Sequence, residues 1–199
     1  MDLGVKGKTA LITGASKGIG RGVANSLAAE GCNLRLAARS GDVLEQAAAE
    51  IRDDYGVKVA VHACDITAEG AIEALAGAGI PDILVNNAGA IPAGDIEAMT
   101  EERWRAAWEL KVFGYINMTR RFFAAMKERG HGVICNVTGL AADKTDFNYV
   151  AGTTGNAGLN AFTKAVGGVS LEYGVRVFAV SPGPVQTERL IGLLKTRAT

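Results

Sequence analysis

Short runs rich in valine, isoleucine and leucine alternate along this chain with longer segments whose apolar residues recur at helical spacing. We expect strands in the short runs, at 8–13, 33–38, 57–63, 82–86, 132–137 and 175–180. Helices are expected between them, at 18–30, 42–54, 68–77, 101–128 and 148–172. This alternation is typical of βαβ units, and strands without a polar face indicate helices on both sides of a parallel sheet. The sequence therefore predicts a three-layer, doubly wound α/β fold of the Rossmann type.

Length, charge and cysteine content restrict the class of protein further. With 199 residues, the chain is expected to form one domain over 1–199, since a domain commonly has about 100–200 residues. Lys and Arg (21) balance Asp and Glu (21), which indicates no surface for a nucleic acid. No segment has the run of about 18 apolar residues that a membrane span needs, so we expect a cytoplasmic protein. No metal site is expected, because Cys32, Cys64 and Cys135 lie far apart without a CxxC pair.

A glycine-rich turn, TGASKGIG at 13–20, directly follows the first predicted strand and opens the first predicted helix. Glycine allows a tight turn and a close approach of the backbone to a pyrophosphate, which the free N–H groups of a helix N-terminus attract. The spacing differs from G-x-G-x-x-G, and an ordinary strand-to-helix turn is the alternative interpretation. The candidate phosphate-binding residues are Gly14, Ser16, Lys17, Gly18, Ile19 and Gly20.

The turn resembles the TGxxxGxG motif of the short-chain dehydrogenase/reductase family, and further matches follow in the family's order. They are Asp65 after the third strand, the NNAG motif at 86–89, Tyr149 at a helix start and PGPVQT at 182–187. The resemblance covers essentially the whole chain. It implies that Asp65 accepts a hydrogen bond from the adenine, that Asn87 and Gly89 line the adenosine ribose, and that Thr187 approaches the nicotinamide or its phosphate. Taken singly, each motif also fits an ordinary loop.

The end of the second strand bears on the choice of dinucleotide. In the resembling family, an acidic residue there accepts from the ribose hydroxyls and repels a 2′-phosphate, whereas this chain has Arg39. Lys17 supplies a second cation. A phosphate monoester carries about −1.5 to −2 charges near neutral pH, and arginine binds it in a bidentate fork. We therefore expect NADP(H) to be preferred over NAD(H). The alternative is that both cations are solvated surface groups, with Asp42 neutralising Arg39.

The resemblance implies hydride transfer between the nicotinamide and a carbonyl or alcohol carbon, with a tyrosine moving the hydroxyl proton. Tyr149 occupies that position. The family's lysine four residues later is replaced by Thr153, which can bind a ribose hydroxyl but carries no charge. The position of the family's serine reads Gly139, with Thr138 one residue earlier as the candidate hydroxyl.

A lysine within an apolar stripe is a further departure from the family. Lys111 stands where the family usually has an asparagine, among apolar residues at helical spacing: Trp104, Trp108, Tyr115, Met118 and Phe122. Burial of an unpaired ammonium group is costly, so this position needs a partner or a function. Our hypothesis is that Lys111 places its charge near Tyr149 and the space at Thr153. The alternative is that Lys111 extends to solvent at the rim of the stripe.

Two functions remain open from the sequence. The first is an NADP(H)-dependent oxidoreductase with Tyr149 as acid/base. The second is a catalytically impaired dinucleotide-binding sensor or assembly subunit, because the tyrosine–lysine–serine pattern matches only at the tyrosine.

The resemblance also implies a homodimer or homotetramer through the helices at 101–128 and 148–172. Family members usually continue with another helix and a seventh strand, which this chain is expected to lack.

Overall fold

Parallel strands form a six-stranded sheet in the order β3-β2-β1-β4-β5-β6 across the part of the chain that the structure describes. The structure, a computed structural model, describes residues 3–89 and 91–187. The strands are β1 (Thr9–Thr13), β2 (Asn33–Ala38), β3 (Val59–Ala63), β4 (Ile83–Asn86), β5 (Gly132–Val137) and β6 (Val175–Val180). Because β1 lies between β2 and β4, the strand order reverses at β1. The predicted doubly wound fold is confirmed.

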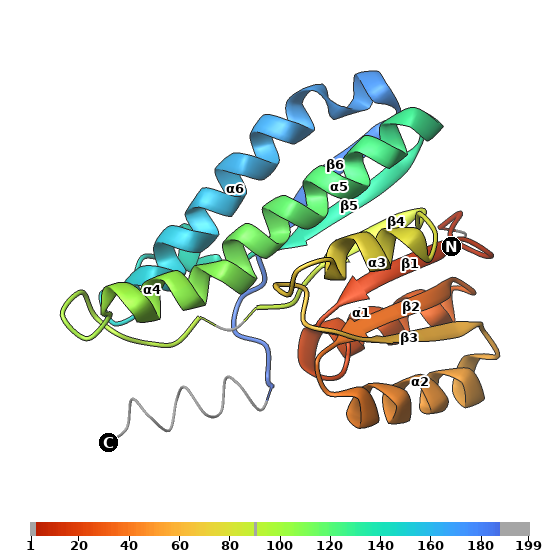
Figure 1. Cartoon of the computed structure of the whole chain (residues 1–199), viewed down its shortest axis with the longest axis horizontal. Helices are drawn as coiled ribbons and strands as arrows, with labels where there is room; N and C mark the ends of the chain where they lie inside the picture. The colour runs from red at the N-terminus through yellow and green to blue at the C-terminus, as the bar shows by residue number, and fades with distance from the viewer. Residues whose placement is uncertain (1–2, 90, 188–199) are drawn as a thin grey trace.

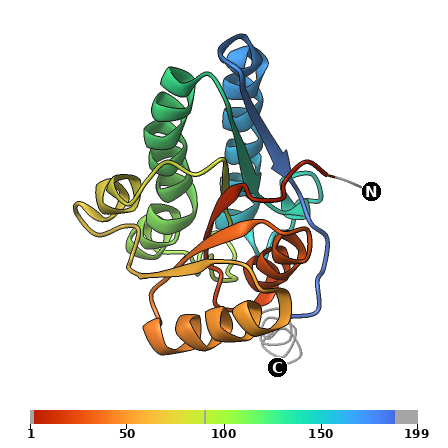
Figure 2. The same cartoon turned by 90° about the vertical axis from the view of Figure 1, so that its right-hand side faces the viewer.

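Helices cover both faces of this sheet. They are α1 (Gly18–Ala29), α2 (Gly41–Tyr55), α3 (Ala71–Gly77), α4 (Glu101–Trp108), α5 (Gly114–Arg129) and α6 (Val150–Ser170), with a π-helix η1 (Glu109–Phe113) between α4 and α5. Single 3₁₀ turns, η2 (Leu140–Ala142) and η3 (Leu171–Tyr173), precede and follow α6. Figures 1 and 2 show α1 and α2 on one side of the sheet and α3, α5 and α6 on the other.

The strands bury both of their faces, which explains why the sequence shows no polar alternation. In β1, Ala10 and Ile12 belong to the core under α1 and α2. Leu11 belongs to the opposite core, with Met118 and Phe122 of α5. Burying a side chain such as leucine or phenylalanine stabilises a fold by about 1.5–3 kcal/mol. The two cores therefore hold the strand ends, and the loops that follow them, in fixed positions.

Several element boundaries differ from the prediction. Strand β3 begins at Val59. Helix α3 begins at Ala71, because a turn with Gly70 at φ 76° precedes it. The helix expected over 101–128 is interrupted by the π-helix η1. The wider π-turn changes the direction in which the following side chains point, and Lys111 lies inside it. The interruption is therefore part of how the site is built.

Candidate active site

A cavity of about 690 Å³ lies at the carboxyl ends of the central strands. Its wall is formed by the β1–α1 turn, the segments after β2, β3 and β4, the π-helix, the end of β5 and residues 185–187. This is the point at which the strand order reverses, where α/β sheets bind their ligands. The cavity brings together most of the site residues that the sequence predicts.

The β1–α1 turn has the backbone geometry that requires glycine. Gly14 and Gly18 have φ of 67° and 58°, in the region where a side chain is strained. A Cβ on Gly20 would overlap the carbonyl of Gly14 and the side-chain amide of Asn87. Helix α1 begins at Gly18 with no side-chain cap from Lys17. Its first N–H groups are thus left to an anion at the turn.

Asn87 fastens this turn to the neighbouring strand β4. Its Nδ2 donates to the carbonyls of Thr13 at 3.0 Å and Gly14 at 3.2 Å. The hydroxyl of Thr13 in turn accepts from the backbone N–H groups of Asn87 and Ala88. Asn87 therefore holds the β1–α1 turn and the loop after β4 at a fixed spacing. Asn87, Ala88 and Gly14 all line the cavity.

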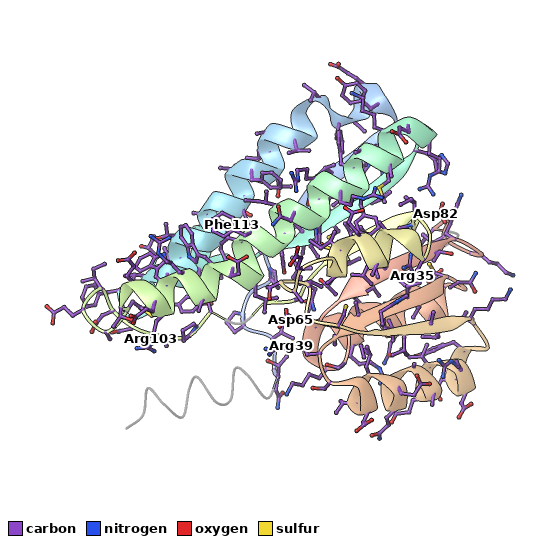
Figure 3. The ribbon with its side chains drawn as sticks, viewed as in Figure 1. Arg35, Arg39, Asp65, Asp82, Arg103 and Phe113 are labelled. Carbon is purple, nitrogen blue, oxygen red and sulfur yellow. The ribbon has the colours of Figure 1, made fainter. Side chains whose placement is uncertain are left out.

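A carboxylate and an arginine lie close together in the wall of the cavity. Asp65 Oδ1 accepts from the backbone N–H of Thr67 at 3.0 Å and from its hydroxyl at 2.8 Å. These hydrogen bonds, with a smaller contribution from the charge of Arg39, lower the pKa of Asp65 below its usual value. Figure 3 shows Arg39 and Asp65 close together beside the sheet. Arg39 and Lys17 are exposed, and all three residues line the cavity.

Lys111 is buried, with an exposed fraction of 8%. Its Nζ donates to the carbonyl of Val137 at 2.6 Å and to the hydroxyl of Tyr115 at 3.1 Å. A longer bond of 3.4 Å reaches the carbonyl of Thr138. The alternative that Lys111 extends to solvent is therefore wrong. The ammonium group is fixed at the carboxyl end of β5, on the cavity wall.

The hydroxyl of Thr138 is held at the end of the neighbouring strand β6. Thr138 Oγ1 lies 2.8 Å from Ser181 Oγ and donates to the carbonyl of Val180 at 3.3 Å. Thr138 is 7% exposed and lines the cavity beside Lys111. Sequence reasoning missed Ser181, although its position directly after a predicted strand was a usable signal. Thr187 lies over the glycine turn, since a Cβ on Gly18 would be 3.5 Å from Thr187 Cγ2.

Tyr149 and Thr153 lie at the start of α6, Tyr149 directly before the helix and Thr153 in its first turn. Tyr149 precedes α6, and its ring packs over Gly152 and against the apolar cluster that contains Trp104 and Trp108. Thr153 Oγ1 accepts from the backbone N–H of Asp146 at 3.4 Å. In the part of the chain that the structure describes, neither residue is among those lining the cavity.

One cysteine lies in the cavity wall. Burial raises the pKa of the Cys64 thiol, and the charge of Asp65 adds to this effect. Burial also raises the pKa of Cys135 to about 11.

Within residues 3–89 and 91–187, no group of three His, Cys, Asp or Glu side chains is placed to hold a metal ion. No helix of this part is long and apolar enough to cross a membrane.

Comparison with known proteins places similarity along almost the entire chain. A family model described as short chain dehydrogenase matches residues 8–197. D-β-hydroxybutyrate dehydrogenase of Cupriavidus necator is 36% identical over 203 residues, which cover 98% of this chain and 77% of that protein.

Solved structures of short-chain dehydrogenases and reductases are also similar along most or all of the chain. L-Sorbose reductase of Gluconobacter frateurii, in complex with NADPH and L-sorbose, matches with a TM-score of 0.93 and 32% identity, covering 100% of this chain and 77% of that one. A 7α-hydroxysteroid dehydrogenase in complex with NADH and 7-oxo-glycochenodeoxycholic acid matches with a TM-score of 0.89 and 30% identity, covering 94% of this chain and 75% of that one.

Proposed function

The chain belongs to the short-chain dehydrogenase family, and on this basis we propose that it is an NADP(H)-dependent oxidoreductase. The proposed reaction moves a hydride between the nicotinamide and a carbonyl or secondary alcohol carbon of a small molecule. The observation that carries the proposal is the cavity, in which the glycine turn, exposed cations and a buried lysine line one space. A bound nicotinamide supplies or accepts the hydride, while the protein binds, orients and transfers the proton.

The residues around the cavity fit a dinucleotide. Because Gly20 has no side chain, the carbonyl of Gly14 and the amide of Asn87 pack directly against the first turn of α1, which keeps the glycine turn tight where a diphosphate would bind. The N-terminus of α1 offers its N–H groups to the same anion. The assigned cofactor-binding residues are those of the sequence prediction: Gly14, Ser16, Lys17, Gly18, Ile19, Gly20, Arg39, Asp65, Asn87, Gly89, Thr153 and Thr187. Gly20 and Thr153 do not line the cavity: Gly20 lies behind the turn that it shapes, whereas Thr153 needs a rearrangement to reach the cavity.

The preference for NADP(H) rests on two cations. Lys17 and Arg39 are exposed and line the cavity, and both are proposed to bind a 2′-phosphate there. Asp65 beside Arg39 lowers the net charge there, so the preference depends on Arg39 turning toward the ligand. The NADPH complex of L-sorbose reductase supports this assignment, whereas the NADH complex of 7α-hydroxysteroid dehydrogenase shows that a related protein takes the other dinucleotide.

Proton transfer is assigned to Tyr149, with Thr138 and Lys111 completing the site. An ordinary tyrosine, with a pKa of about 10, is ionised in only about one molecule in a thousand at pH 7. A fixed positive charge near the phenol favours the ionised form. Lys111, the buried cation of the cavity wall, is the proposed charge, and this role requires the Tyr149 ring to move toward the cavity, which it does not line in this structure. Thr138, anchored by Ser181, is the candidate hydroxyl to polarise the substrate oxygen.

A second function is favoured by one observation. Because Tyr149 and Thr153 lie outside the lining of the cavity among the described residues, a protein that binds the dinucleotide without catalysis would have this arrangement. Such a protein would act as a sensor or an assembly subunit. The two functions share the cofactor site and differ only in turnover.

One experiment separates the two functions. The protein is titrated with NADPH and with NADH, following cofactor fluorescence, and is then assayed with a panel of ketones, keto acids and sugars. An oxidoreductase binds NADPH more tightly than NADH and oxidises it with at least one substrate. Tight binding without turnover on any substrate would support the sensor. Absence of binding to either dinucleotide would refute both functions.

A further inference from the structure

Arg35 is a charged residue in the interior of the sheet, on the face that α3 covers. Its side chain is 7% exposed, and Figure 3 shows it between the sheet and α3. His62 of the neighbouring strand β3 faces the same way, because Val59 and Val61 of β3 pack in the core on the side of α1 and α2. A buried guanidinium without acceptors would be costly, so the partners of Arg35 indicate what this charge does.

Two donors of Arg35 hold the C-terminal turn of α3. Its Nη2 donates to the carbonyl of Leu75 at 2.6 Å, and its Nη1 donates to the carbonyl of Gly79 just after the helix. The last carbonyls of a helix have no partner inside it and carry the negative end of its dipole, so a cation there is stabilising. Helix α3 has 7 residues, and a helix this short needs tertiary contacts to stay folded. Arg35 therefore attaches α3 to the sheet.

The third donor of Arg35 fixes the charge state of His62. Arg35 Nε donates to His62 Nε2 at 3.2 Å. A guanidinium has no acceptor, so His62 Nε2 must carry the lone pair, and the neutral ring has its proton on Nδ1. Burial, with a smaller contribution from the charge of Arg35, lowers the pKa of His62 below its usual 6.5. A protonated ring would turn N–H against N–H at this contact, because both nitrogens of an imidazolium are donors.

No carboxylate within residues 3–89 and 91–187 forms an ion pair with Arg35 or His62. Glu73 of α3 is paired with Arg121 of α5 at 2.8 Å, and Asp82 accepts from a backbone N–H of β1 at 2.8 Å. The titratable groups of the elements around the contact, besides the two residues that form it, are Lys58, Cys64, Glu73, Asp82 and Arg129. A proton added to His62 therefore places a second positive charge beside Arg35 without a bonded carboxylate to balance it.

We propose that His62 is a pH-sensitive latch for α3: the neutral ring accepts from Arg35, and protonation breaks this hydrogen bond, sets two cations against each other and loosens the helix. The inference does not depend on the proposed oxidoreductase function. The segment from His62 to α3 contains Asp65 and Ile66, which line the cavity, so the latch holds an element beside the candidate cofactor site. Its stabilising contribution is complete above the pKa of histidine in the unfolded chain, about 6.5. The contribution is lost as pH falls through the lower pKa of His62 in the folded chain.

The first test compares the Tm of the wild type with that of His62→Gln at about pH 7.5 and about pH 5.5, the range in which histidine changes its charge. The carboxamide oxygen of glutamine accepts a hydrogen bond from Arg35 but does not titrate. Between these pH values the Tm of the wild type should fall by about 2–4 °C more than that of His62→Gln, which corresponds to roughly a fivefold change in the unfolding equilibrium.

His131→Gln is the matched control for this comparison. His131 is the other of the 2 histidines in the chain, and its side chain is exposed, so the variant should keep the pH dependence of the wild type. An equal fall of the Tm in the wild type and in His62→Gln would overturn the inference. It would also be overturned if His131→Gln abolished the pH dependence.

Hydrogen exchange tests whether α3 is the element that loosens. The backbone amides of α3 are compared between the wild type and His62→Gln at the same pH, so that the intrinsic effect of pH on exchange cancels. The ratio of the two exchange rates over α3 should rise by about threefold or more when the pH falls from about 7.5 to about 5.5. Helix α2, on the other face of the sheet, is the internal control. An unchanged ratio over α3, or an equal rise over α2, would contradict the latch.

A measurement on the wild-type chain keeps the test decisive if His62→Gln does not fold. Nitrogen chemical shifts of the two histidine rings, assigned by comparison with His131→Gln, report which nitrogen carries the proton and at what pH a second proton binds. We expect His62 to carry its proton on Nδ1 at about pH 7.5 and to bind the second one below the usual pH of about 6.5. A proton on Nε2, or protonation at about pH 6.5 or above, would overturn the inference.

Discussion

The side chain of Lys111 passes directly over Gly89, so that a Cβ at position 89 would overlap Lys111 Cδ. The two residues come from different elements, the loop after β4 and the π-helix η1. Gly89 thus provides the passage through which the lysine stem reaches the end of β5, where Nζ donates to the carbonyl of Val137. The resemblance assigns Gly89 to the ribose, and the structure adds a role in admitting Lys111.

Substitution of Gly89→Ala is expected to displace Lys111 from the carbonyls of β5. Inserting a methyl group into packed surroundings typically costs about 1–3 kcal/mol, so the free energy of unfolding should fall by that amount, and kcat should fall with it. Urea denaturation and steady-state kinetics measure the two effects. Gly22→Ala is the matched control, since a Cβ there meets nothing within 4 Å. Equal stability of the two variants would contradict the close approach.

Lys111→Met tests the charge of the buried lysine with little change in volume. We expect kcat to fall by about 10²–10⁴-fold, the usual contribution of a group that assists proton transfer. NADPH binding should persist, because the glycine turn and Arg39 are untouched. The control is Lys127→Met. Lys127 belongs to α5, and its Nζ lies over the ring of Tyr173. Near-normal turnover in Lys111→Met would leave the lysine with a structural role only.

Much of the fold was predictable because it depends on which residues avoid water. The strand segments carry runs of Val, Ile and Leu that both layers of helices bury, and the positions of β2, β5 and β6 agree with the prediction. The apolar stripe around Lys111 was also visible, and Tyr115, Met118 and Phe122 are fully buried. Hydrophobic periodicity reports burial well, so it located the lysine inside the core.

Local backbone geometry was the part that periodicity did not reveal. The π-helix at Glu109–Phe113 changes only one turn of a long helical segment, and apolar spacing does not distinguish it from an α-helix. The position of the Tyr149 ring over Gly152 is a rotamer choice that depends on neighbouring side chains.

The stabilising contribution of the Asp65 carboxylate is expected to appear in the pH dependence of the Tm. Hydrogen bonds from Thr67 and the charge of Arg39 lower the pKa of this carboxyl below the usual 3.8. A lowered folded-state pKa means that the carboxylate stabilises the folded chain above the unfolded-state pKa, and that this contribution is lost as pH falls through the folded-state pKa. Asp65→Asn should therefore lower the Tm at pH 7, and this difference should shrink as pH falls from the unfolded-state pKa through the lower folded-state pKa. A difference in Tm that is independent of pH would contradict this assignment.

The charge of Arg39 is expected to determine which dinucleotide binds. Arg39→Asp replaces a cation at the cavity rim with a carboxylate beside Asp65, which repels a 2′-phosphate and offers ribose hydroxyls an acceptor. The ratio of kcat/KM for NADPH to that for NADH should fall by about 10–100-fold, since each tenfold change requires about 1.4 kcal/mol. Arg105→Asp makes the same charge change at an exposed ion pair with Glu101 on α4 and should leave the ratio unchanged. An unaltered ratio in Arg39→Asp, with kcat retained, would show that Arg39 is a solvated surface group. Lys17 would then be the remaining candidate cation for binding the 2′-phosphate.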